Sequence, residues 1–216
     1  MSKFFLSTII LAFVYSSAFA QEFKPKEGDW GAEVNFTPFS SSPININYIK
    51  IREFAKANKA IRFGLFIGAE FENTEVGDED VKNQTIELNL RPGYEFHYPG
   101  TERLSPYVGI EADLAIKLSK SVTGEGETEQ ELDGAWNLFG NERGFYRFGV
   151  NGLAGVDFYI SPRLYLGTEF GFGFEYIQQS KIELTAGDTT ISEEDGGSSF
   201  QLGPNVNGAI RLGFNF

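Results

Sequence analysis

Apolar and polar residues alternate along most of this chain. From Ile61 to Phe71 the apolar residues fall on odd positions, and from Ile86 to Tyr98 they fall on even positions. A period of two over nine or more residues is typical of a long β-strand with one apolar and one polar face. The pattern predicts six such strands, at 61–71, 86–98, 108–118, 146–160, 164–176 and 200–216.

Two more strands are predicted before these six. Residues 30–37 alternate cleanly, whereas in 44–54 the apolar residues change from even to odd positions. A β-bulge resets the alternation in this way, so we expect one within the second strand. Pro92 and Pro204 lie inside predicted strands, and each is expected to mark a bulge because proline cannot donate to a ladder. The total of eight is even, as closure of a bacterial single-chain barrel requires.

The two faces of the six strands differ in charge. The apolar faces hold no charged residue, whereas the polar faces hold thirteen: Arg62, Arg91, Lys117, Arg147, Arg211, Glu70, Glu87, Glu95, Glu111, Asp113, Asp157, Glu169 and Glu175. A strand that crosses a bilayer obliquely needs ~9–11 residues, whereas soluble sandwiches use strands of ~5–6. The pattern therefore favours an all-β fold, a closed eight-stranded antiparallel transmembrane barrel with its charges in the lumen. The alternative, a soluble barrel that carries a ligand inside, requires the faces to point the other way.

The predicted connections alternate in length. They are short at 55–59, 99–105 and 161–162, and long and polar at 75–84, 119–143 and 179–198. Short turns on one side and long loops on the other are typical of up-and-down barrels of bacterial outer membranes, with both termini at the periplasmic side. Aromatic residues near the strand ends are expected to form interfacial girdles: Trp30, Tyr94, Phe96, Tyr98, Tyr107, Phe158, Tyr159, Phe214 and Phe216 on the periplasmic side, and Tyr146, Phe174 and Tyr176 on the outer side.

Residues 1–20 have the features of a secretory signal peptide. Lys3 precedes a short apolar run, and Ala18-Phe19-Ala20 fits the peptidase that cleaves after small residues. We expect cleavage after Ala20, with an uncleaved anchor helix as the alternative. Residues 21–216 are then expected to form a single outer-membrane barrel domain.

The C-terminal residues Ile210-Arg-Leu-Gly-Phe-Asn-Phe216 alternate and end in a phenylalanine. With the leader and the eight strands, this chain resembles the small OmpA/OmpX-type outer-membrane β-barrel superfamily and its "outer membrane protein beta-barrel domain" group. The resemblance implies an integral protein of the cell outer membrane with both termini in the periplasm. It also implies that Phe214 and Phe216 are a signal read by the barrel assembly machinery, and that lipids and lipopolysaccharide surround a monomer. It implies no shared catalytic residues.

Charges inside an eight-stranded barrel have little water to share, so they are expected to pair with one another. The predicted lumen network comprises Arg62, Arg91, Arg147, Arg211, Glu70, Glu111, Asp157 and Glu169. A salt-bridged plug that rigidifies the wall is favoured over a conducting pore.

The three long loops hold fifteen acidic residues against Lys82, Lys120, Arg143 and Lys181. A solvated outer surface is the favoured interpretation. Binding of a divalent cation is the alternative, with Glu125, Glu127, Glu129 and Glu131 as its candidate ligands, although no segment has the spacing of an EF-hand loop. Residues 181–192 predict a hairpin beyond the membrane, either a ribbon for partner capture or simply a long hairpin.

Composition excludes several kinds of chemistry. The net charge of −12 disfavours nucleic acid as a partner, and the absence of cysteine excludes disulfides and thiolate sites. His97 is the only histidine, and there is no Gly-x-Ser-x-Gly motif. We therefore expect no enzyme activity and no cofactor, and a structural or surface-interaction (adhesion) role. The alternatives are a narrow pore or transporter for small hydrophobic molecules, and a lipid A-modifying enzyme in which His97 acts as the base.

Overall fold

The computed structural model describes residues 23–36, 44–77, 79–126, 129–205 and 210–216. The predicted leader therefore lies outside the described residues. The described residues form twelve strands, all paired antiparallel: β1 (Trp30–Phe36), β2 (Ile44–Lys56), β3 (Lys59–Val76), β4 (Glu79–His97), β5 (Leu104–Thr123), β6 (Gln130–Asp133), β7 (Phe145–Ser161), β8 (Leu164–Gln179), β9 (Ile182–Ala186), β10 (Thr189–Glu194), β11 (Ser198–Asn205) and β12 (Ile210–Asn215). Within these ranges, no helix is long and apolar enough to cross a membrane.

Eight of the strands pair in a ring. Neighbours in the sequence order β1-β2-β3-β4-β5-β7-β8-β12 are hydrogen-bonded, and β12 pairs back onto β1. At this seam Gly31 lies opposite Asn215, and Phe36 lies opposite Ile210. The predicted eighth strand is divided into β11 and β12, both of which pair with β8. All the other predicted strands are confirmed, and most are several residues longer than the alternation indicated.

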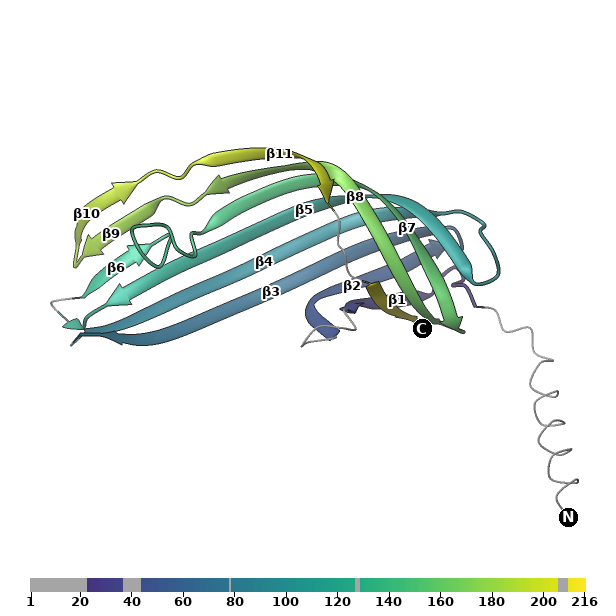
Figure 1. Cartoon of the computed structure of the whole chain (residues 1–216), viewed down its shortest axis with the longest axis horizontal. Coiled ribbons are helices and arrows are strands. Elements are labelled where there is room, and N and C mark those ends of the chain that lie inside the picture. Colours follow the sequence, from purple (N-terminus) through teal and green to yellow (C-terminus); the bar gives the residue numbers. More distant parts are fainter. Residues whose placement is uncertain (1–22, 37–43, 78, 127–128, 206–209) are drawn as a thin grey trace, which may run out of the picture.

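The two ends of the ring differ. The short turns after β2, β4 and β7 lie at the end that also carries the C-terminus (Figure 1). At the other end β3, β4 and β5 run on past the ring, and the short strands β6, β9 and β10 extend the sheet beside them (Figure 1). The ring therefore has one compact end and one long, open-sided end, which we call the turn end and the extended end.

The predicted loop at 75–84 is wrong. There β3 and β4 remain paired up to Val76 and Glu79, and Gly77, with φ of 69°, lies in the tight turn. The predicted loop at 119–143 contains the end of β5 and all of β6, and the predicted hairpin at 181–192 is confirmed as β9 and β10. Alternation could not reveal the continued strands because both faces of these segments are polar, so only backbone pairing distinguishes them from loops.

The bulge expected in the second strand is confirmed. Val34 pairs with Ile49 but Asn35 pairs with Asn45, so the extra residues are on β2. The bulge expected at Pro92 is wrong, because the register between β4 and β5 is the same on both sides of it; proline only leaves the ladder locally unpaired. Pro204 remains in register with β8 as well. The register shift comes after Pro204. Asn205 faces Gly171 and Arg211 faces Gly167, so six residues of the C-terminal segment are matched by four residues of β8.

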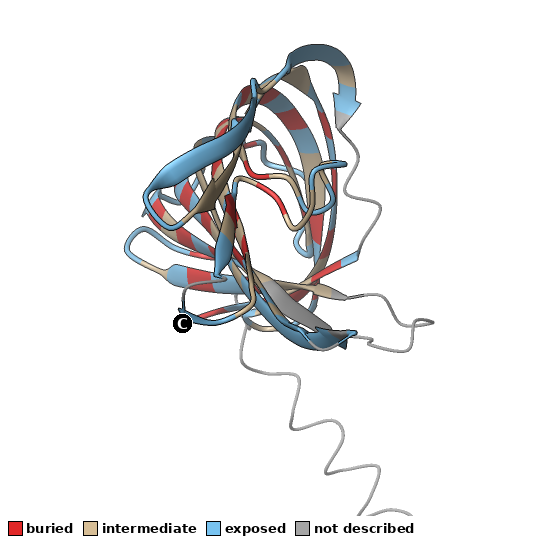
Figure 2. Cartoon of the chain, turned by 90° about the vertical axis from the view of Figure 1, so that its left-hand side faces the viewer, coloured by how far each residue is buried: buried red, intermediate tan, exposed pale blue. Residues whose placement is uncertain are grey.

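The faces of the ring point as predicted, with polar side chains inside. Arg62 is 1% exposed, whereas Ile110 is 56% exposed. Viewed from the extended end, buried and exposed residues alternate along the strands (Figure 2). This excludes the alternative of an apolar interior that carries a ligand. Seven of the nine aromatic residues expected in the periplasmic girdle are exposed, but Tyr107 and Tyr159 are buried, because both lie on the polar-face parity of their strands.

Candidate functional site

Nine charged side chains meet inside the turn-end half of the ring, and every one of the eight ring strands contributes at least one. We call them the inner cluster: Glu33 from β1, Lys50 and Arg52 from β2, Arg62 from β3, Glu95 from β4, Glu111 from β5, Asp157 from β7, Glu169 from β8 and Arg211 from β12. All nine are buried. Charges this far from water are stable only when they are paired, so the cluster ties the eight strands together from inside.

Three arginines hold the inner cluster together. Arg52 contacts Glu95 at 3.0 Å and Asp157 at 2.8 Å through Nη1. Its Nε lies 2.7 Å from Glu33. A single guanidinium group therefore joins β2 to β1, β4 and β7 with the planar fork geometry that suits carboxylates.

Arg62 and Arg211 connect the remaining strands. Arg62 lies 2.8 Å from Glu111, 3.0 Å from Glu95 and 2.7 Å from Glu169. Arg211 lies 2.7 Å from Glu33 and 2.9 Å from Asp157. The carboxylates outnumber the basic groups by five to four. Four of the five carboxylates contact two or three basic groups of the cluster each, and Glu111 contacts Arg62.

Aromatic rings and glycines complete the packing of this half. The Tyr107 hydroxyl donates to Glu169, and the Arg52 guanidinium lies 4.9 Å from the centre of the Tyr165 ring. A Cβ at Gly155 would overlap Tyr107, and one at Gly213 would overlap Tyr165. The absence of a side chain at these two glycines therefore lets the tyrosine rings pack against the strands.

The turn end is also covered from outside the ring. Phe23 packs with Tyr159 and Tyr165, and the Arg103 guanidinium lies 4.3 Å from the centre of the Phe23 ring. Lys24 donates to the carbonyl of Pro99 in the turn after β4. The segment before β1 thus lies across the same end that the inner cluster fills.

A second group of charges, the outer cluster, lies nearer the extended end. Asp113 is buried and forms ion pairs with Arg91 at 2.9 Å and with Arg147 at 3.2 Å. Asn89 donates to Asp113 at 2.7 Å and accepts from Arg91 Nε at 3.0 Å. Glu175 lies 3.7 Å from Arg147. These contacts fix the direction of both guanidinium groups.

The structure places the eight predicted network residues in different surroundings. Arg62, Arg211, Glu111, Asp157 and Glu169 are in the inner cluster, Arg91 and Arg147 are in the outer cluster, and Glu70 is exposed beyond both. The prediction missed Glu33, Lys50, Arg52 and Glu95. Glu95 is on the charged face already recognised, and Lys50 and Arg52 share one parity on the far side of the β2 bulge, which is the signal that could have identified them.

His97 is buried at the turn end of β4. Its Nδ1 lies 3.0 Å from Ser105 Oγ and its Nε2 lies 3.1 Å from Glu95 Oε2, and its ring lies between Phe54 and Tyr107. The order serine, histidine, glutamate is that of a hydrolytic triad. Here all three side chains are buried, and Glu95 is bound by two arginines, so the arrangement is that of a packed strand end.

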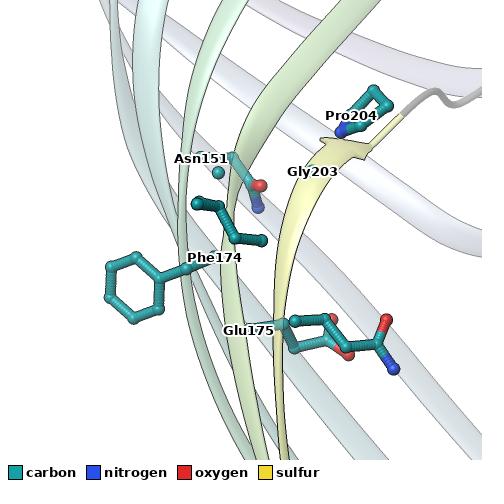
Figure 3. A pocket seen from close by; sticks show the side chains of 8 residues that line it. Asn151, Phe174, Glu175, Gly203 and Pro204 are labelled. Carbon is teal, nitrogen blue, oxygen red and sulfur yellow. The ribbon is translucent and has the colours of Figure 1, made fainter.

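Two cavities are lined in part by residues of the outer cluster. One of about 230 Å³ is lined by Asn35, Tyr48, Phe66, Glu87, Asn89, Arg91 and Arg147. The other, of about 210 Å³, lies against β7, β8 and β11. Figure 3 shows Phe174 pointing away from this second cavity, while Asn151 and Glu175 lie on its side of the wall. The ring interior is therefore filled at the turn end and hollow toward the extended end.

The described candidate cation ligands of the second long loop line neither of these cavities. Glu131 pairs with Lys120, Glu125 lies 3.5 Å from Lys82, and Glu129 is exposed. Glu127 lies outside the described residues. Within the described ranges, no three His, Cys, Asp or Glu side chains are grouped as a metal site requires.

Comparisons with known proteins give one solved structure to report. No family model matches the chain, and no curated protein matches it. The solid-state NMR structure of the outer membrane protein AlkL in DMPC lipid bilayers is similar over 93% of this chain and 95% of that chain, with 15% identity and a TM-score of 0.35. At that TM-score the two folds are not shown to be the same.

Proposed function

We propose that this chain is an integral protein of a bacterial outer membrane, an eight-stranded barrel whose lumen is sealed by the inner cluster. The observation that carries the proposal is the inverted distribution of side chains, with the nine buried charges of the inner cluster and Asp113 inside the ring and apolar residues outside it. In water such a surface would expose a broad apolar band. In a bilayer the same band contacts acyl chains. The pairing of β12 with β1 satisfies the backbone hydrogen bonds of both strands at the seam, as lipid requires.

The orientation follows from the two ends of the ring. Outer-membrane barrels have short periplasmic turns and longer outer segments. The turn end, with Phe23 and the C-terminal strand, is therefore proposed to face the periplasm. The extended end, with β6, β9 and β10, is proposed to face the outside.

We propose a non-enzymatic, structural or surface-interaction role, in which the extended end is the part available to a partner. The sealed turn end supports this role, because the ion pairs and tyrosine rings of the inner cluster occupy the route that a solute would take. The mature chain is proposed to act as a monomer and to be inserted by the barrel assembly machinery.

The test is made on the mature chain folded into lipid vesicles. We expect it to require detergent for extraction, to run as a heat-modifiable band on a gel, and to give no steady single-channel conductance at modest voltage. A chain that remains dissolved without detergent would refute the membrane location. A steady open channel would refute the sealed lumen.

A second candidate function is lateral passage of small apolar molecules. β2 pairs with β3 only as far as Tyr48 and Phe66, and within the described ranges the edge of β3 beyond Phe66 has no further partner on that side. β11 likewise pairs with β8 alone among the described strands. Unpaired backbone in lipid is costly, so an interruption of the wall at this level favours a path between the cavities and the acyl chains.

This second candidate is tested by filling the cavity beside β11. Gly203 lines it, and a Cβ there would meet no atom within 4 Å. Gly203→Trp should abolish vesicle uptake of a fluorescent apolar probe, and Ile191→Trp on the distant β10 should leave it unchanged. Uptake equal to that of protein-free vesicles in the unmodified chain would exclude the route.

A further inference from the structure

We infer that the 230 Å³ cavity above the outer cluster binds a small zwitterion with an apolar side group, of the amino-acid class. The cavity brings together three chemically distinct surfaces: two arginines, one glutamate and two aromatic rings. They come from different strands, since Arg91 and Glu87 are on β4, Arg147 is on β7, Phe66 is on β3 and Tyr48 is on β2.

The arginines present donors that the protein does not use. Asp113 and Asn89 hold Arg91 through Nη2 and Nε, and Asp113 holds Arg147 through Nε. Among the described residues, Arg91 Nη1 and both terminal nitrogens of Arg147 donate no hydrogen bond. The two side chains are 19% and 18% exposed, so solvent reaches them. Guanidinium groups oriented in this way recognise carboxylates.

Glu87 presents the opposite charge to the same cavity. It lies directly across from Gly68 on β3 and Lys117 on β5, but Lys117 is bound to Glu142 instead. Within the described ranges Glu87 has no ion-pair partner within 4.0 Å, although two arginines line the same cavity. The cavity thus keeps a carboxylate and two guanidinium groups apart, which is the arrangement that a ligand carrying an ammonium and a carboxylate would bridge.

The aromatic wall consists of the Tyr48 and Phe66 rings, and two glycines on β3 leave room for them. A Cβ at Gly64 would overlap the Tyr48 ring, and one at Gly68 would lie 3.0 Å from the Phe66 ring. The rings can therefore lie flat against the strand and face the cavity, with Tyr48 also 5.2 Å from the Arg91 guanidinium. They supply an apolar surface between the two charged sides.

Size and net charge agree with a small neutral ligand. A volume of about 230 Å³ equals roughly eight water molecules at their share of the liquid. The negative charges of Asp113 and Glu175 already balance the positive charges of the two arginines. An anionic ligand would therefore be repelled by Glu87. A cationic ligand would be repelled by the guanidinium groups. A zwitterion satisfies both sides without changing the net charge of the lumen.

The experiment uses the full chain folded in nanodiscs, with L-phenylalanine as the probe and binding followed by saturation-transfer NMR and calorimetry. We expect saturable binding of phenylalanine. The two one-charge analogues, phenethylamine and 3-phenylpropionate, should bind at least about tenfold more weakly, because each leaves one charged side of the cavity unmatched.

The variants separate the two sides of the site. Glu87→Gln and Arg147→Met should each weaken phenylalanine binding about tenfold or more, while Glu79→Gln, an exposed carboxylate at the far end of the same strand, should not. Circular dichroism and the heat-modified band show whether each variant is folded, so a folding defect is not mistaken for lost binding.

Three results would overturn the inference. The first is no saturable binding of phenylalanine to the folded chain. The second is an analogue that binds as tightly as phenylalanine, which would indicate a cation or an anion site. The third is an equal effect of Glu79→Gln and Glu87→Gln. None of them bears on vesicle insertion or conductance, so the proposed function is judged separately.

Discussion

Arg62 on β3 and Glu169 on β8 form a bidentate ion pair across the inside of the ring, with 2.7 Å between Nη1 and Oε2 and 3.0 Å between Nη2 and Oε1. The two residues are 107 positions apart in the chain. Their contact exists only because eight strands return to one another, and it links opposite sides of the ring.

Arg62→Met is expected to lower the free energy of unfolding by about 3–5 kcal/mol, because it leaves three buried carboxylates with fewer cations. A urea titration of the vesicle-inserted chain, followed by the heat-modified band, measures this change. Adding Glu169→Gln to the variant should restore part of the loss, since it removes one of the uncompensated charges.

The matched control is Lys82→Met, which removes a pair 3.5 Å from Glu125 whose side chains are largely exposed. Exposed pairs contribute about 1 kcal/mol or less. Equal effects of the two substitutions would mean that the inner cluster does not brace the wall.

Ile110→Arg tests whether the exposed apolar face contacts lipid. Ile110 on β5 and Ile191 on β10 are both 56% exposed, but only Ile110 lies on the ring. In a bilayer an arginine at the middle of the apolar band costs about 2–4 kcal/mol, whereas Ile191→Arg should change stability by less than about 0.5 kcal/mol. The measurement is the unfolding free energy in vesicles, and two equally small effects would contradict a membrane-embedded ring.

Gly155→Ala is expected to destabilise the protein by about 1–3 kcal/mol, because the new methyl group would displace the Tyr107 ring from its contact with Glu169. Gly203→Ala is the control, since a Cβ there meets open space. The midpoint of thermal band conversion on a gel reports both variants. If Gly155→Ala behaved like Gly203→Ala, the glycine would not be needed for the tyrosine to pack.

The pKa values of the Glu131 and Asp133 carboxyl groups on β6 are expected to be shifted in opposite directions. Burial, and then the neighbouring Glu131 carboxylate, raise the pKa of Asp133, whereas a hydrogen bond with Lys120 lowers the pKa of Glu131. Carbonyl ¹³C shifts recorded against pH should place the Asp133 transition above about 3.9 and the Glu131 transition below about 4.3. An Asp133 transition below about 3.9 or a Glu131 transition above about 4.3 would show that β6 does not hold these contacts.

The stability of β6 against β5 and β9 follows from these directions. A carboxyl group with a raised pKa binds more protons in the folded state, so its contribution declines as pH rises from about 3.9 through the raised pKa of Asp133. The Glu131 contribution is present above about 4.3 and is lost as pH falls through its lowered pKa. Amide exchange of β6, corrected for intrinsic rates, should show the first change, and Asp133→Asn should remove it.

Alternation along the chain located seven of the eight ring strands and the direction of their faces, but it joined β11 and β12 into one predicted strand. It placed Arg62 inside and Ile110 outside, because side chains on a strand point to opposite sides at every step. It also located the bulge of β2 from the change of parity. It missed β6 and the continuation of β3 and β4, because polar residues on both faces carry no period.

The partners inside the ring were decided only by the tertiary structure. Parity shows that Arg52, Glu95 and Asp157 can share an interior, but which carboxylate meets which guanidinium depends on the register and height of each strand around the ring. Tyr107 illustrates the same limit, since its position at a strand end suggested a girdle and its register placed it against Glu169. Local pattern specifies a direction for each side chain, whereas a contact between distant strands exists only after β12 has paired with β1.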